Sequence, residues 1–298
     1  RHINNVDYIK AGVSMFDGIK CLCESVRPLW IFSLNQDLLV EYLAKEWRIP
    51  FQTGFHQSVI DIVVKKEDGS HLGSIPVHTL ITENLIKEPL DFIKSGDFGV
   101  NLFKIHGSLD IFMAEELNKI VKLAYLDEGG ESVFGLLQRL NQKLAFWGPP
   151  KATNEIMYFD KNGVLQFFRR ALITGTQKYK KHLLLALPKD FIQLFRSNLN
   201  HVSHLAVVGY GLGDNHINDI LQDWLEFSEN RQITIVNPGT KAIPQFLAHL
   251  QKQLTVRNET ASEYFSLYND NQPSLMNEIY RNIRKRLRDR TPRSLEKL

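Results

Sequence analysis

The stretch over residues 205–218 constrains the fold more than any other part of the chain. An apolar run at 205–208 leads into Gly209, Gly211 and Gly213, and Asp214, a good helix cap, then opens an amphipathic segment. This order is typical of a buried strand that passes through a glycine turn into a helix, at the carboxyl edge of a parallel sheet. It predicts an α/β protein that binds a nucleotide. A tight strand–helix turn without a ligand remains the alternative, because G-x-G-x-G alone is a weak pattern.

Strands and helices alternate along the chain, which predicts an α/β fold with a doubly wound, Rossmann-like parallel sheet. We expect one domain over residues 1–275, a helical insertion over about 111–150 and a basic C-terminal segment over 276–298. The predicted strands are 29–34, 58–65, 78–82, 102–105, 171–176, 205–208 and 233–236, with a hairpin over 157–168. The predicted helices are 37–47, 111–125, 133–146, 188–199 and 215–227.

Composition excludes several classes of protein. The chain of 298 residues is long enough for a large core, and it has no apolar run of about 18 residues that would span a membrane. Its two cysteines, Cys21 and Cys23, provide neither a disulfide framework nor a zinc module. His201 and His204 have no second pair nearby, so we expect no metal. We expect a cytoplasmic protein.

Two predicted strands end in residues that could carry chemistry. Asn35 and Asp37 follow the first, where they can present an amide and a carboxylate to one crevice. The alternative is that Asp37 caps the next helix and Asn35 is a turn residue. His106 follows another strand and precedes Gly107, where it can act as a general base near neutral pH. A structural histidine is the alternative.

Together, these motifs resemble the sirtuin-like family, in the bacterial branch that serves anti-phage defence by degrading NAD. Residues 33–41 (SLNQDLLVE) are similar to its T-x-N-x-D-x-L-x-E pattern, 106–108 to its H-G-S motif and 209–217 to its G-Y-S-x-x-D-x-x-I motif. Residues 174–178 (TGTQK) are similar to its small-residue loop. The resemblance covers roughly residues 28–240.

The resemblance implies an NAD+ glycohydrolase that cleaves the nicotinamide–ribose bond, with NAD as substrate. It implies that Asn35 positions the ribose or water, that Asp37 maintains the geometry and that His106 is the general base. It implies further NAD contacts at Ser33, Gly107, Ser108, Thr174, Gly175, Gly209, Tyr210, Gly211, Asp214 and Asn237.

The chain departs from the family in two places. The family's Gly-Ala-Gly-x-Ser loop is not found, since residues 10–14 (KAGVS) match it poorly; we expect that segment to lie upstream of Arg1. The four-cysteine zinc module of the deacylases is also absent, which favours NAD hydrolysis over protein deacylation.

The resemblance also implies partners: other copies of this chain in a homo-oligomer, and a HerA-type ATPase. The C-terminal segment 276–298 carries eight basic and three acidic side chains, so it is a candidate contact for DNA or for a partner, or simply a solvated helix face. The alternative function is a catalytically weak nucleotide-sensing or scaffold subunit of a defence complex, or its nuclease.

Overall fold

The chain forms two compact units, which are described separately below. The computed structural model describes residues 14–65, 68–81, 85, 87, 89–114, 119–124, 155–160, 162–172, 190–240, 242–268 and 282. The central unit comprises residues 24–198, and the terminal unit comprises residues 1–23 and 199–298. Within the described part, no helix is long and apolar enough to cross a membrane.

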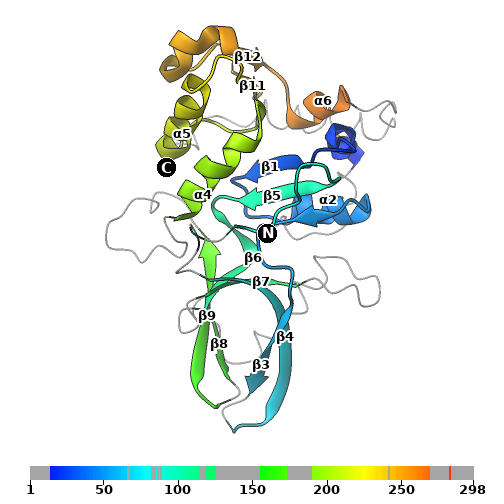
Figure 1. Cartoon of the computed structure of the whole chain (residues 1–298), viewed down its shortest axis with the longest axis vertical. Helices are drawn as coiled ribbons and strands as arrows, with labels where there is room; N and C mark the ends of the chain where they lie inside the picture. The colour runs from blue at the N-terminus through cyan, green and yellow to red at the C-terminus, as the bar shows by residue number, and fades with distance from the viewer. Residues whose placement is uncertain are drawn as a thin grey trace. The chain divides into compact units, whose positions relative to one another are not determined.

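The central unit contains a three-stranded parallel sheet with the order β1-β5-β2 (Figure 1). β1 (Leu29–Ser33) and β2 (Phe51–Gln52) flank β5 (Val100–Lys104), and every residue of β5 is buried. The sequence predicted a strand at residues 102–105, and β5 begins two residues earlier. The predicted helix after β1 is confirmed as α2 (Leu39–Glu46), whose Tyr42, Leu43 and Ala44 are buried.

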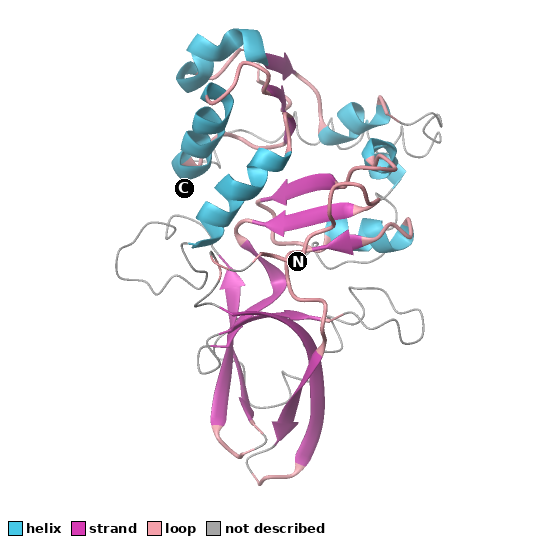
Figure 2. Ribbon diagram, in the orientation of Figure 1, coloured by secondary structure: helices cyan, strands magenta, loops and turns pink. Residues whose placement is uncertain are grey.

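This unit also contains six antiparallel strands, which curve into a sheet that closes on itself (Figures 1 and 2). One pair, Lys65 with Phe159, joins its first and last strands. In spatial order they are β3 (Ile60–Lys65), β4 (His71–Ile81), β7 (Lys119–Leu123), β6 (Gly107–Ala114), β9 (Leu165–Leu172) and β8 (Glu155–Phe159). β8 and β9 confirm the predicted hairpin, in which Asp160 Oδ1 accepts the backbone N–H groups of Asn162 and Val164.

The predicted helical insertion over 111–150 is wrong where the structure describes it. Residues 111–114 belong to β6 and residues 119–123 to β7, which pair with each other in antiparallel fashion. The error has a physical cause: short apolar runs have no decisive period, and here they are buried by partner strands distant in sequence. The second predicted helix, 133–146, lies outside the described residues.

The terminal unit contains a second parallel sheet, with the order β10-β11-β12. β10 (His204–Val208) and β11 (Gln232–Val236) confirm two predicted strands, while β12 (Leu254–Arg257) was not predicted. Its helical segments are η1 (Ser14–Leu22), η5 (Leu199–His201), α5 (Asn215–Glu226), η6 (Gln245–Gln253) and α6 (Ala261–Ser266). α4 (Asp190–Asn198), in the central unit, confirms the predicted helix over 188–199. The structure thus confirms a mixed α/β protein with parallel sheets.

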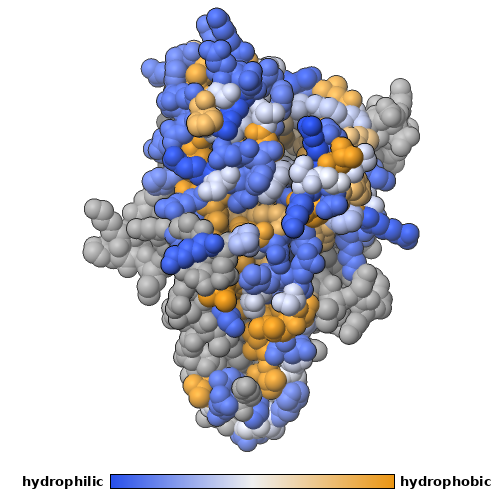
Figure 3. Space-filling view, in the orientation of Figure 1, coloured by the Kyte–Doolittle hydropathy of each residue, from blue (hydrophilic) through white to orange (hydrophobic). Residues whose placement is uncertain are grey.

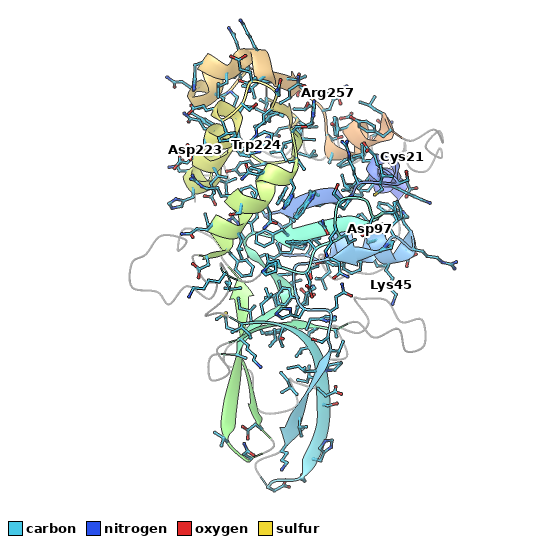
Figure 4. The ribbon with its side chains drawn as sticks, in the orientation of Figure 1. Cys21, Lys45, Asp97, Asp223, Trp224 and Arg257 are labelled. Carbon is cyan, nitrogen blue, oxygen red and sulfur yellow. The ribbon has the colours of Figure 1, made fainter. Side chains whose placement is uncertain are left out.

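α5 follows the predicted amphipathic pattern. Trp224 is buried and donates its indole N–H to the carbonyl of Leu199 at 3.0 Å, whereas the neighbouring Asp223 is exposed (Figure 4). The guanidinium of Arg231 stacks over the Trp224 ring, 5.0 Å from its centroid. On the face that Figure 3 shows, this unit is mainly hydrophilic with scattered apolar residues. Phe227 is an exposed apolar side chain of this unit, 79% exposed.

Replacing Phe112 tests the corrected position of β6. Phe112 is 2% exposed and pairs with Val121 of β7 and Arg170 of β9. We expect Phe112→Ala to lower the free energy of unfolding by about 3–5 kcal/mol, because it leaves a cavity in the core. Denaturant titration measures this loss. Val164→Ala, at a position 50% exposed, is the control and should change it by less than about 0.5 kcal/mol. Equal effects of the two substitutions would contradict the assignment.

Candidate functional site

The parallel pairing of β1 with β5 brings two groups of predicted site residues to one sheet edge. Ser33 lies opposite Lys104 in the register, and the N–H of Ile105 donates to the Ser33 carbonyl at 3.0 Å. Asn35 comes two residues after Ser33, and His106 comes two residues after Lys104. The carboxyl ends of these strands therefore place the loop after β1 (residues 34–38, hereafter the β1 loop) beside the segment that carries His106.

The backbone of the β1 loop is tightly held, while the Asn35 residue is exposed. The Ser33 hydroxyl accepts the N–H of Asn35 at 3.2 Å and lies 3.3 Å from its carbonyl oxygen. Ser33, a predicted NAD contact, thus uses its hydroxyl to shape the loop. The amide of Asn35 is left at the surface, where it is accessible to a ligand.

Asp37 has the structural role that the sequence left open. Its Oδ1 accepts the N–H of Leu39, the first residue of α2, at 3.0 Å. The first N–H groups of a helix lack partners within the helix, so this contact stabilises the start of α2. Asp37 therefore maintains the geometry of the β1 loop and of the helix that follows.

His106, 6% exposed, lies in the short connection from β5 to β6, and Ser108, 0% exposed, is the second residue of β6. Gly107 between them has φ +77°, a left-handed conformation that favours glycine. The Ser108 hydroxyl donates to the Gln36 carbonyl at 3.3 Å, and the Leu109 N–H donates to the same oxygen at 3.0 Å. The His-Gly-Ser segment is therefore joined directly to the β1 loop.

Beneath this edge lies a buried cluster of four charges that the sequence analysis missed. Lys104 Nζ lies 3.4 Å from Glu41 Oε2, and Lys122 Nζ lies 3.8 Å from Glu41 Oε1 and also pairs with Asp110. All four residues are no more than 4% exposed. Their signal in the sequence was a lysine with apolar neighbours, Lys104 within residues 102–105 and Lys122 within residues 120–123, because buried charges require partners.

Burial raises the pKa of the Glu41 carboxyl above its ordinary value. Desolvation is the largest cause; the nearby ammonium groups of Lys104 and Lys122 oppose it, and Asp110 adds to it. Because the cluster is shielded from water, its charges interact more strongly than they would at the surface.

In the terminal unit, the glycine loop (residues 209–214) follows β10 as predicted. Gly209 has φ +70° and donates its N–H to the Val236 carbonyl at 2.8 Å, which extends the sheet by one bond. The Tyr210 hydroxyl accepts the N–H of Asp214 at 3.0 Å and also contacts the Asp214 carbonyl and Asn218 Oδ1. Asn237 Nδ2 donates to the Tyr210 carbonyl at 3.3 Å. Tyr210 and Asn237 thus support the loop from inside.

Gly211 and Gly213 have no such internal reason to be glycine. Both are exposed, neither has a positive φ, and a Cβ added at either would meet nothing within 4 Å. Glycine at an unconstrained, open position permits a ligand to approach the backbone closely. Asp214 stands at the N-cap of α5, as expected, but its side chain makes no capping hydrogen bond.

Each unit therefore brings its own predicted residues together. In the central unit these are Ser33, Asn35, Asp37, His106, Gly107 and Ser108; in the terminal unit they are Gly209, Tyr210, Gly211, Asp214 and Asn237. Thr174 and Gly175 lie outside the described residues. Across the described ranges, no group of three or more His, Cys, Asp or Glu side chains could hold a metal ion.

The Tyr210 hydroxyl gives a pH-dependent test of the glycine loop. Burial is the main cause that raises its pKa to about 12 from an ordinary value of 10.0. Tyr210→Phe should lower the free energy of unfolding by about 1–3 kcal/mol, because Asp214 and Asn218 lose a partner. The difference in free energy of unfolding between wild type and Tyr210→Phe should have its full size below pH 10. Between pH 10 and 12 the folded state keeps the phenol proton while the unfolded state loses it, so the difference should disappear as the pH rises through 12.

Urea titrations at several alkaline pH values measure this difference. Tyr268→Phe is a matched control, because its partially exposed hydroxyl contacts only the Tyr264 hydroxyl, at 3.2 Å, among the hydrogen bonds described. It should cost less stability than Tyr210→Phe. A Tyr210→Phe difference that stays constant to pH 12 would contradict the buried, hydrogen-bonded hydroxyl.

Comparison with known proteins adds nothing to these residues: no protein-family model and no curated protein matches the chain. The function proposed below therefore depends on the geometry of the β1 loop, the His106 segment and the glycine loop.

Proposed function

We propose that the protein is an NAD+ glycohydrolase that cleaves the nicotinamide–ribose bond and releases nicotinamide and ADP-ribose. The observation that carries the proposal is the pairing of β1 with β5, which places the exposed Asn35 and the loop bearing His106 at one carboxyl edge of a parallel sheet. At such an edge an amide can orient a ribose, and an imidazole can activate a water.

The reaction breaks the bond between the ribose C1′ and the nicotinamide nitrogen. Nicotinamide leaves with the bonding electron pair, and positive charge develops on the ribose, as in glycoside hydrolysis. A water then attacks C1′ and gives up one proton. In this proposal Asn35 orients the ribose or the water, His106 accepts the proton, and Asp37 keeps the β1 loop in place through its bond to Leu39.

The glycine loop is proposed to bind the adenosine half of NAD. The open positions of Gly211 and Gly213, together with the amino terminus of α5, support this, because helix amino termini favour anions. Asn237 is proposed to lie near the adenine ribose, and Thr174 and Gly175 to contact NAD. A doubly wound, Rossmann-like sheet is part of the same proposal, supported by the two parallel sheets.

The biological setting is also proposed: depletion of NAD in the cytoplasm as the effector of an anti-phage defence system. An NADase that worked without control would kill its host, so assembly with other copies or with a HerA-type ATPase is the expected switch. The basic segment 276–298 is a candidate contact for DNA or for that partner.

Release of nicotinamide from NAD tests the proposed activity and its site. The chain, alone and with its proposed ATPase partner, should release nicotinamide in a chromatographic assay. We expect Asn35→Ala and His106→Ala to lower kcat/KM at least about 100-fold, in the range lost when a general base is removed. Asn230→Ala and His204→Ala, both at exposed positions elsewhere, are matched controls that should retain the wild-type rate. No release by wild type under any assembly condition would refute the enzyme; wild-type rates in both site variants would refute the site.

Bulk added at Gly211 tests the glycine loop separately. The series Gly211→Ala and Gly211→Val should fold as the wild type does, because the added Cβ meets nothing within 4 Å and φ is not positive. If the adenosine half of NAD lies against this backbone, KM for NAD should rise stepwise, about tenfold or more for valine, or about 1.4 kcal/mol of binding. Thermal unfolding and steady-state kinetics give the two readouts. An unchanged KM across the series would contradict a ligand at this loop.

A further inference from the structure

All three central carbonyl groups of the β1 loop are engaged by the elements around it. The Gln36 carbonyl accepts from the Leu109 N–H and the Ser108 hydroxyl. The carbonyls on either side, those of Asn35 and Asp37, both accept from the Lys104 ammonium, the former at 3.4 Å. One side chain therefore spans the loop, and the exposed Asn35 amide lies on the backbone that it holds.

The position of Lys104 in β5 and the charge of Glu41 both favour its contact with the loop carbonyls. It is the last residue of β5 and is 3% exposed, so its charge is almost wholly removed from water. Glu41 of α2, 0% exposed, supplies the compensating carboxylate at 3.4 Å. A buried ion pair is weak evidence for stability, because apolar residues of similar volume often replace it without loss. The contacts of Lys104 to the loop carbonyls therefore point to a role beyond folding.

We propose that Lys104, with Glu41 as its counter-charge, is a positioning residue that sets the place of Asn35 at the sheet edge. This inference rests on the proposed NAD+ glycohydrolase activity. Lys104 acts on the backbone of the β1 loop and touches no reacting atom. Its loss displaces Asn35, and a shift of about 1 Å in such a group is enough to cost on the order of 100-fold in rate.

The double variant Lys104→Met with Glu41→Leu separates positioning from stability. It removes the charges of Lys104 and Glu41, leaves the Lys122–Asp110 pair and fills the volume with apolar atoms, so its melting temperature should stay close to that of wild type. We expect kcat to fall about 10- to 100-fold while KM for NAD changes less than about threefold, because the loop is displaced but the remaining contacts to the substrate persist. A folded double variant with the wild-type kcat would overturn the proposal.

A second variant covers the case in which the double variant does not fold. Lys104→Gln keeps one amide group that can donate to a loop carbonyl, and we expect an intermediate kcat. Asn101→Leu is the matched control, because Asn101 is also a buried polar residue of β5 but contacts another segment. Its Oδ1 accepts the Ile93 N–H at 2.8 Å, and its Nδ2 donates to the Ile93 carbonyl at 2.9 Å. It should lower the melting temperature and leave the kcat of the folded protein unchanged. Equal kcat values for Lys104→Gln and wild type would overturn the proposal.

Hydrogen–deuterium exchange distinguishes failure of this inference from failure of the proposed function. In Lys104→Gln, and in the double variant, the amides of Leu39 and Leu109 should exchange faster, since both are bonded to the β1 loop. In Asn101→Leu the faster exchange should appear at Ile93 instead. If wild type releases no nicotinamide, the proposed function fails, and the exchange pattern still decides whether Lys104 holds the loop. Unchanged exchange at both leucine amides would overturn the positioning role.

Discussion

The parallel pairing of β1 with β5 is the constraint on which the central unit depends. Because Ser33 and Lys104 are in register, the β1 loop and the His106 segment leave the sheet at the same level. The backbone bonds that follow, from Ile105 to Ser33 and from Leu109 to Gln36, extend this alignment beyond the strands. A slip of one residue would reverse the faces of β1 and separate Asn35 from His106.

Buried charge is the second organising element of this unit. Lys104, Glu41, Lys122 and Asp110 come from β5, α2, β7 and β6, so the cluster connects the parallel sheet to the closed antiparallel sheet. Buried charges of opposite sign lie close together only when their elements are correctly placed, so a cluster of this kind favours one arrangement over its competitors. The Asn35 edge is built on that arrangement.

The sequence predicts those strands and site residues whose place is decided by neighbouring residues in the chain. The ends of β10 and β11 were predicted correctly, and those of β1 and β5 to within one residue, because an apolar run stops close to a polar or glycine residue. The strands at 111–114 and 119–123 were mistaken for a helix, because the partners that bury them, β4 and β9, come from distant parts of the chain. The same limit applies to the site: the position of Asn35 followed from its strand, whereas the pairing of Lys104 with Glu41 required the fold. The side chain of Asp214 was expected to cap α5 and does not, since the local pattern shows only its position.

The closure of the antiparallel sheet has a mechanical consequence. Among the residues that the structure describes, β3 and β8 meet through one pair, Lys65 with Phe159, whereas the other five junctions each contain four or more pairs. A seam held by so few bonds is the weakest line of the ring, so thermal opening should begin there and leave the other junctions intact. The closed sheet is therefore best described as a six-stranded curved sheet whose edge strands, β3 and β8, pair weakly. Opening at this seam would leave the pairs of β6 in place, and β6 is the strand that follows His106 directly.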